Sequence, residues 1–319
     1  MDIANLAEDV LQALVSGLLI GCIYALMCVG LGLIFGIMRV INFAQGEFLM
    51  IGMYLTFYLT GALGIQSLLG AELGPFAIAV IAGPVVFVLG FIVHRLLLAP
   101  ATVRRSNRRG RESHYGQLIL TLGLTLILEN GALLLFGAEP HSVQTTASSR
   151  AWEIGPMLGD DVTIFVDHAR MYAAVISILI AVALFGFVGR TRTGKALRAA
   201  SDNRVAAGYV GIDVTRIHGL AFGLGCGVTA IAGGVMSTYL PVQPYIGLDF
   251  IVVMYAGVVL GGLGQLHGAF WGGLVIGVVQ QMSSLILPLQ LENTAVFVVF
   301  LALLLLRPQG LFGRATNRG

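Results

Sequence analysis

The sequence predicts an all-α protein, a polytopic bundle of transmembrane helices in one domain that covers residues 1–319. Two observations predict this fold class. Apolar residues make up 57% of the chain and charged residues only 11%, with a mean hydropathy of +0.90, whereas soluble chains average about 25% charged residues. The apolar residues also form unbroken runs longer than the ~18 residues that separate a spanning helix from a buried one.

The apolar runs predict about nine crossings, and eight to ten fit the pattern because run ends are set only to within a few residues. The runs lie near residues 10–36, 46–64, 75–98, 115–136, 169–188, 218–239, 248–265, 268–286 and 292–306. Cys22, Cys28 and Cys226 lie inside these runs. We therefore expect buried thiols and neither a disulfide framework nor a metal site.

Charge placement predicts the orientation, because Lys and Arg in short loops stay on the cytoplasmic side of a membrane. In an arrangement of about nine crossings, all of the 18 Lys and Arg residues except Arg150 and Arg170 fall on one side. They gather at residues 99–114, at 190–217 and in the C-terminal tail, while most acidic residues fall on the other side. The sequence therefore predicts an N-terminus outside and a C-terminus in the cytoplasm.

Two connections between the predicted helices are long enough to have structure of their own. The external one, residues 137–168, contains turn formers around an alternating VTIFV, which predicts a short strand or a hairpin. The cytoplasmic one, residues 190–217, is rich in basic residues and small apolar ones.

The stretch GRTRTGKA, residues 189–196, resembles the phosphate-binding pattern G-x-x-x-x-G-K-[ST]. A phosphate loop follows a buried strand and ends in Ser or Thr, whose hydroxyl binds magnesium. Here Ala196 stands in the place of that hydroxyl, and the preceding apolar run predicts a spanning helix. We therefore predict that this stretch does not bind ATP.

The rest of the cytoplasmic connection predicts a short helix. Ser201 or Asp202 can cap its N-terminus, and Gly211 can end it because glycine adopts the left-handed conformation at no steric cost. Its apolar face at helical spacing consists of Val205, Ala206, Tyr209 and Val210. Such a helix suits a groove on another protein, or else it lies on its own bundle.

The stretch RVINFAQGEF, residues 39–48, interrupts apolar sequence with polar groups. Irregular backbone at membrane depth survives only beside protein or a watery cavity, and ionisable groups near a span mark a functional path or an interhelical anchor. We favour a discontinuous helix that lines a path over a plain cytoplasmic turn; alternatively, Glu47 pairs with Arg39 as a static lock. The candidate path residues here are Asn42, Gln45, Gly46 and Glu47.

A second candidate path region is GGLGQLHGAFWGG, residues 261–273. Small residues three or four apart permit close approach of helices, and the glycines here are Gly261, Gly264, Gly268 and Gly272. They surround two further path candidates, Gln265 and His267. We expect His267 to be a packing residue rather than a proton carrier.

Four stretches together point to a known family: INFAQGEFLMIGMY (41–54), TGKALRAASDNRVAAGYVGIDVTRI (193–217), VVLGGLGQLHGAFWGGLVIG (258–277) and LLLRPQGLFG (304–313). In these the chain resembles the permease family of ATP-binding-cassette (ABC) importers for branched-chain amino acids, which also includes permeases for urea, short amides and some aromatic acids. The matches follow one order along nearly the whole chain.

The resemblance implies a single transmembrane permease domain over residues 1–319, in the inner membrane of a bacterial cell. It implies four kinds of neighbour: a second homologous permease subunit, two cytoplasmic ABC ATPase subunits, an external or periplasmic substrate-binding protein, and the lipid bilayer. The connection at 190–217 then corresponds to a coupling helix that docks in the ATPase. The matching positions are Ser201, Asp202, Asn203, Arg204, Gly211 and Ile212.

The favoured function is a non-enzymatic subunit that imports branched-chain amino acids or related small solutes. Two alternatives stay open: a permease for urea or short amides, and a self-sufficient channel or secondary carrier in which Glu47 and Glu129 serve a proton or an ion. We predict no catalytic, cofactor or metal site, because neither paired carboxylates nor a Ser/His set appears and the six histidines are dispersed. Nothing in the sequence indicates nucleic-acid binding.

Overall fold

The computed structural model describes residues 3–62, 66–100, 112–143, 145, 147–148, 150–157, 162–288, 291–307 and 309–313. Helices dominate this part of the chain, which confirms the prediction of a helical bundle. The arginine-rich part of 99–114, with Arg104, Arg105, Arg108, Arg109 and Arg111, lies outside the described residues. So does the end of the tail, with Arg314 and Arg318.

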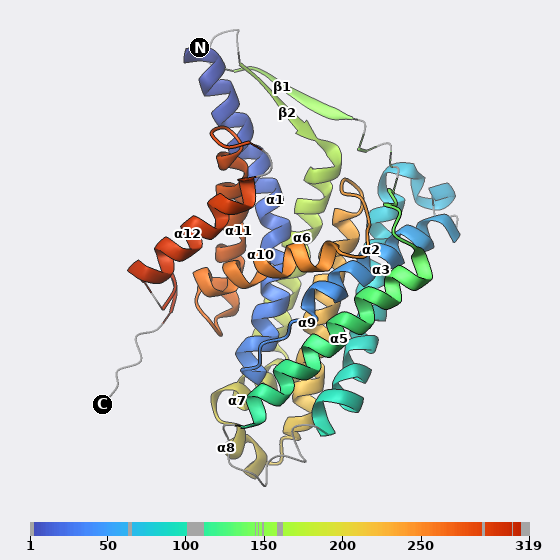
Figure 1. Ribbon diagram of the computed structural model, residues 1–319, viewed down its shortest axis with the longest axis vertical. Coiled ribbons are helices and arrows are strands. Elements are labelled where there is room, and N and C mark those ends of the chain that lie inside the picture. Colours follow the sequence, from blue (N-terminus) through green and yellow to red (C-terminus); the bar gives the residue numbers. More distant parts are fainter. Residues whose placement is uncertain are drawn as a thin grey trace.

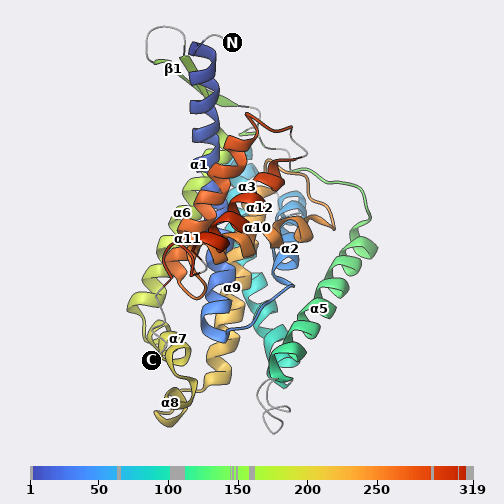
Figure 2. The ribbon, with the colours of Figure 1, turned by 60° about the vertical axis from the view of Figure 1, so that its left-hand side comes forward.

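The bundle is elongated, with a hairpin at one end and two short helices at the other (Figures 1 and 2). The longer helices are α1 (Ile3–Met38), α2 (Gln45–Ala62), α3 (Gln66–Val93), α5 (Glu112–Phe136), α6 (His168–Arg190), α9 (Val214–Met236), α10 (Ile246–Gly261), α11 (Leu266–Ser283) and α12 (Glu292–Leu306). A π-helical turn, η1 (His94–Leu98), continues α3. The two short helices are α7 (Arg192–Asp202) and α8 (Arg204–Tyr209).

The hairpin forms within the external connection, as the VTIFV alternation predicts. Its strands β1 (Ala151–Met157) and β2 (Val162–Asp167) pair antiparallel. The backbone of Phe165 attaches the hairpin to the side chain of Gln12 in α1 through two hydrogen bonds: its N–H donates to Gln12 Oε1 at 2.9 Å, and its carbonyl accepts from Gln12 Nε2 at 2.8 Å. The hairpin therefore lies at the N-terminal end of α1, opposite α7 and α8 (Figure 1).

α9 forms the centre of the bundle, and α1, α2 and α3 pack around it. Every residue of α9 from Val228 to Met236 is buried. Close approach depends on glycine: a methyl group at Gly52 of α2 would overlap the backbone of Ala230, and one at Gly233 of α9 would overlap the backbone of Leu49. Such contacts let helices associate where lipid supplies no hydrophobic driving force.

The glycines of residues 261–273 also lie at a helix contact. A methyl group at Gly261 would overlap the backbone of Gly268, and one at Gly272 would overlap that of Gly257. Gly264 has another role, because its φ of 86° places it in the tight turn between α10 and α11. The spacing predicted a close helix approach, which the structure shows between α10 and α11. Gly264, at the same spacing, lies in a turn and not on a helix.

Five helical stretches in the described part of the chain are long and apolar enough to cross a membrane: Glu8–Met38, Glu72–Leu98, Gly116–Phe136, His168–Arg190 and Val214–Met236. The other four apolar runs form shorter helices; α10, for example, has 16 residues, about 24 Å at 1.5 Å per residue against a hydrocarbon core of about 30 Å. Figure 1 shows α10 running across the bundle, whereas α1 and α9 run along it. The count of about nine crossings and the sides of the two termini stay predictions.

Candidate functional site

The stretch that resembles a phosphate loop is the start of a helix. Thr191 caps α7: its side-chain oxygen accepts a hydrogen bond from the backbone N–H of Gly194 at 3.0 Å. The N–H of Lys195 donates to the carbonyl of Thr191 at 3.0 Å. These two amides would have to be free to cradle a phosphate. The segment therefore lacks both the magnesium ligand and the open backbone of a nucleotide site.

The predicted cap at Ser201 or Asp202 is wrong, because α7 continues through both residues and ends at Asp202. Asn203 caps α8 instead, with its side-chain oxygen accepting from the N–H groups of Val205 at 3.1 Å and Ala206 at 3.0 Å. Ser201 is turned the other way: its hydroxyl donates to the carbonyl of Gly36 in α1 at 2.7 Å. α7 is thereby tied to the end of α1.

The predicted stop at Gly211 is confirmed, since this residue has a φ of 84°. Ile212 follows it, donates its N–H to the carbonyl of Ala207 at 3.0 Å and packs against the core of the bundle. Asp202, Asn203 and Arg204 are exposed between the two short helices. All six residues matched to the coupling position thus lie in one compact segment at one end of the bundle.

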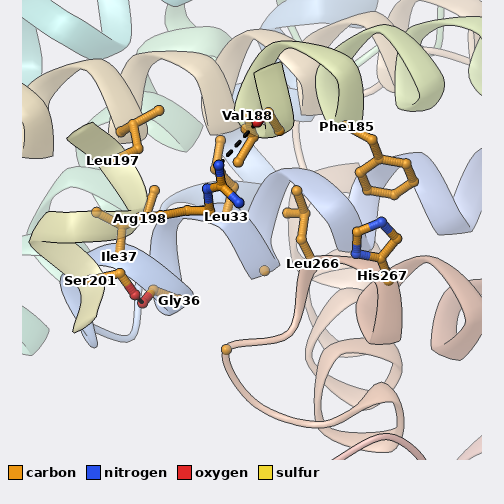
Figure 3. Close-up of a pocket in the computed structure, with 13 residues that line it drawn as sticks. Leu33, Gly36, Ile37, Phe185, Val188, Leu197, Arg198, Ser201, Leu266 and His267 are labelled. Atoms are coloured by element: carbon orange, nitrogen blue, oxygen red, sulfur yellow. Dashed lines mark hydrogen bonds between the residues drawn. The ribbon is translucent and has the colours of Figure 1, made fainter. Parts of the chain in front are cut away.

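A cavity of about 230 Å³ lies beside this segment, between the ends of α1 and α6, α7 and the start of α11 (Figure 3). Ser201 lies at one end of the cavity with Gly36, and His267 lies at the other with Phe185. The His267 ring stacks on Phe185 with centroids 4.5 Å apart. Gln265 is half-buried at the N-terminus of α11. Ser201 and His267 therefore line the same cavity, at its opposite ends.

The other path candidates lie elsewhere, at the start of α2. Asn42 and Gln45 are fully buried, and the Asn42 amide donates to Gln45 Oε1 at 2.9 Å. Gln45 Nε2 donates in turn to α9, to the carbonyl of Gly225 at 3.1 Å and to Thr229 Oγ1 at 2.6 Å. These amides hold the irregular segment before α2 against α9, as buried polar groups require.

Gly46 and Glu47 face α10. A methyl group at Gly46 would overlap the backbone of Gly247, and one at Gly247 would come within 2.8 Å of Glu47 Oε1. The Glu47 side chain is 1% exposed, and its Oε2 atom is buried with no hydrogen-bond partner. The ion pairs among described residues are Arg150–Glu72 and Arg170–Asp167. The alternative in which Arg39 pairs with Glu47 is therefore wrong.

A larger cavity, of about 440 Å³, lies between α2 and α5. We call it the α2–α5 cleft and define it by six of its lining residues: Met50, Ile51, Tyr54, Leu128, Ala132 and Phe136. Tyr54 stacks on Phe136 with ring centroids 4.3 Å apart, and its hydroxyl is buried without a hydrogen-bond partner. Figure 2 shows α5 at the edge of the bundle.

The apolar runs and motifs do not predict this cleft, although the sequence of α5 carries a signal for its buried face. Four polar residues recur at every fourth position of α5, which places them on one helical face; they are Gln117, Thr121, Thr125 and Glu129, all buried. A polar stripe on an otherwise apolar spanning helix points to the interior of a bundle. Of these four residues, the sequence pattern singled out Glu129 alone, as a possible proton or ion group of a carrier.

The bundle of long apolar helices in glycine-mediated contact defines a multi-pass membrane protein. The family described as branched-chain amino acid transport system, permease component, matches residues 13–306. The chain belongs to this family.

Individual relatives agree over nearly the whole chain. The high-affinity branched-chain amino acid transport system permease protein LivH of Escherichia coli K12 is 30% identical over 308 residues, which is 95% of this chain and 96% of LivH. BraD of Pseudomonas aeruginosa, named for the same transport system, is 30% identical with the same coverage of both chains. A probable LivH of Methanocaldococcus jannaschii is 28% identical over 90% of this chain and 88% of its own length. No solved structure matches.

Proposed function

We infer that this chain is the membrane-spanning permease subunit of an ABC importer, which moves branched-chain amino acids delivered by an external binding protein across a bacterial inner membrane. The names of its relatives support the solute class. The partners are a second homologous permease subunit and two cytoplasmic ABC ATPases. The chain itself performs no chemistry, so the energy for import comes from ATP hydrolysis in those partners.

The observation that carries this proposal is the exposed apolar face of α8. Val205 is 64% exposed, Tyr209 87% and Val210 76%, whereas Ala207 on the opposite face is buried against the bundle. A short helix that presents apolar side chains to solvent suits a groove on a partner protein. The sequence also allowed this face to pack on the bundle of the same chain, but side chains packed in that way would not be so exposed.

The surroundings of α8 suit a coupling role. Asn203 fixes the start of the helix and Gly211 its end. The bond from Ser201 to Gly36 joins the segment to α1, whose other end carries the hairpin. A displacement of α8 by an ATPase would therefore act on a helix that runs the length of the bundle. The hairpin end is, in this proposal, the side on which the binding protein delivers solute.

Reconstitution in vesicles tests the proposal. The chain with its partner permease, ATPases and binding protein is expected to accumulate leucine when ATP is present, and to stop when the ATPase is replaced by a hydrolysis-dead version. Leucine uptake by the chain alone that follows membrane potential would instead establish a channel or secondary carrier. Uptake of urea or amides in preference to leucine would establish the other alternative.

Two changes in the coupling segment test its role. Gly211→Pro forces φ to about −65° where the chain needs a positive value, and the paired reversal Asp202→Lys with Arg204→Glu inverts the exposed charges beside α8. Each is expected to abolish ATP-driven uptake while the protein still reaches the membrane, measured by uptake and by quantifying the membrane fraction. Unchanged uptake in both would remove the coupling assignment.

A further inference from the structure

We propose that a cavity between η1 and the start of α9 binds the phosphate group of an anionic membrane lipid through the guanidinium groups of Arg95 and Arg216. The proposal goes beyond the proposed function and does not depend on it, because it concerns the contact of this chain with the bilayer rather than the passage of solute. It commits the cavity to a lipid headgroup with a net negative charge.

The cavity lies where α3 and its continuation η1 pack against α9. Its volume of about 510 Å³ falls within the ~300–1,000 Å³ that is usual for small-molecule sites. Phe91 and His94 line it from the first segment, and Thr215 lines it from α9. Each segment also contributes one arginine to the wall, Arg95 from η1 and Arg216 from α9. The packing of two helices that are distant in the chain thus creates a basic cavity.

The two arginines have no anionic partner in the part of the chain that the structure describes. Neither Arg95 nor Arg216 takes part in an ion pair between described residues. Asp213 also lines the cavity, but its Oδ1 atom caps α9 by accepting a hydrogen bond from the backbone N–H of Arg216 at 3.1 Å. With two guanidinium groups and one carboxylate, the wall carries a net positive charge. The cavity therefore favours an anion.

The donors in the wall suit a phosphate group in particular. The planar guanidinium group of arginine donates two parallel hydrogen bonds to phosphate oxygens, and such charge-assisted bonds are stronger than neutral ones. Arg95 and Arg216 come from different helices, so that one phosphate can bridge them. The hydroxyl of Thr215, which lines the same cavity, is a further donor.

The position of the arginines in the spanning stretches favours a lipid over a soluble anion. Arg95 lies close to the end of the spanning stretch Glu72–Leu98, and Arg216 lies close to the start of Val214–Met236. Charged side chains at the ends of spanning helices reach the level of the lipid headgroups.

The neighbours of Arg95 also suit a lipid. The side chains of Leu96 and Leu97 are 68% and 45% exposed, and they offer an apolar surface to acyl chains beside the proposed phosphate site. A free phosphate, or an acidic segment of a protein, would gain nothing from these leucines. Basic pockets between spanning helices on the cytoplasmic side are known to bind anionic headgroups.

A lipid in this cavity would act next to the coupling segment. α9 starts at Val214, directly after Gly211 and Ile212. A phosphate held by both arginines would join η1 to the start of α9, and would thereby hold in place the helix that follows the coupling segment. We therefore expect anionic lipid to stabilise the folded permease.

Native mass spectrometry of the purified permease in detergent measures the binding. The wild type should retain dioleoylphosphatidylglycerol in preference to dioleoylphosphatidylcholine, which has the same acyl chains and no net charge. Arg95→Gln and Arg216→Gln should each weaken binding of phosphatidylglycerol about tenfold, the loss expected when a hydrogen bond to a charged group is removed. Arg192→Gln is the matched control, because it removes an exposed arginine of α7 that does not line the cavity. It should bind phosphatidylglycerol like the wild type.

A second measurement uses the wild type alone and so does not depend on the folding of a variant. Phosphatidylglycerol should raise the unfolding temperature in detergent at concentrations at which phosphatidylcholine and inorganic phosphate do not. Equal stabilisation by inorganic phosphate, or equal retention of phosphatidylglycerol by the wild type and both cavity variants, would overturn the proposal. Variants that keep the lipid but lose binding of the ATPase would assign the cavity to an acidic segment of that partner, and the proposal would fail.

Discussion

The buried polar groups of α2 have hydrogen-bond partners on one side of the helix and lack them elsewhere. Towards α9, Gln45 has donors and acceptors all around it, and Gly52 brings the two helices into backbone contact. Towards α5, a cavity separates the helices, and the Tyr54 hydroxyl has no partner; Glu47 Oε2, on the side of α10, has none either. One helix thus carries both a closed interface and an open one.

This difference teaches how to interpret polar residues in a membrane sequence. Asn42, Gln45 and Glu47 are almost adjacent in the chain, and each is buried. The amides complete a network that holds the chain before α2 in place, whereas Oε2 of the carboxylate has no hydrogen-bond partner. Burial alone does not separate an anchor from a binding group; the satisfaction of each polar atom does.

The largest effect is expected at the closed interface. Gly52→Val places a side chain into the backbone of Ala230, which should reduce the free energy of unfolding by about 3 kcal/mol or more, the upper range for overpacking. The measurement is the monodisperse fraction after detergent extraction, followed by thermal unfolding. The matched control is Gly131→Val, whose added Cβ meets no atom within 4 Å in the open cleft. Equal losses in the two variants would show that the cleft is packed like the α9 interface.

A smaller loss is expected from Gln45→Leu. The change leaves the Asn42 amide and the Thr229 hydroxyl without their partner in a buried site, at a cost of about 1–3 kcal/mol. Thermal unfolding of the purified protein measures it. Thr229→Val added to Gln45→Leu should cost less than the two single changes together, because both remove the same bond. Strict additivity would mean that this hydrogen bond contributes nothing to the interface.

Much of the architecture follows from the sequence because it depends on local pattern. Apolar runs identify the helices, VTIFV the hairpin, and Gly211 the end of α8. The helix cap went to Asn203 rather than to Ser201 or Asp202, because the hydroxyl of Ser201 bonds to Gly36, which is 165 residues away in the chain. Local pattern carries no information about such a partner.

The candidate site shows the same limit. The motifs identified Glu47 and His267 as one path, but His267 stacks on Phe185 beside α7 while Glu47 lies against α10. Which helices meet is decided by packing between distant segments. The α2–α5 cleft likewise forms only where two helices that are distant in the chain, α2 and α5, pack against each other. The stripe on α5 indicated which face is turned inward and not which helix it meets.

The smallest effect on stability, and the sharpest contrast with Gln45, is expected from Glu47→Gln. An amide is less costly to bury than an unpaired carboxylate, and the change breaks no described hydrogen bond or ion pair. Without solute, the free energy of unfolding should therefore stay within about 0.5 kcal/mol of the wild type or rise. Thermal unfolding beside the exposed control Glu139→Gln measures it. A loss comparable to that of Gln45→Leu would mean that Glu47 is an anchor of the bundle, and the two sides of α2 would no longer differ.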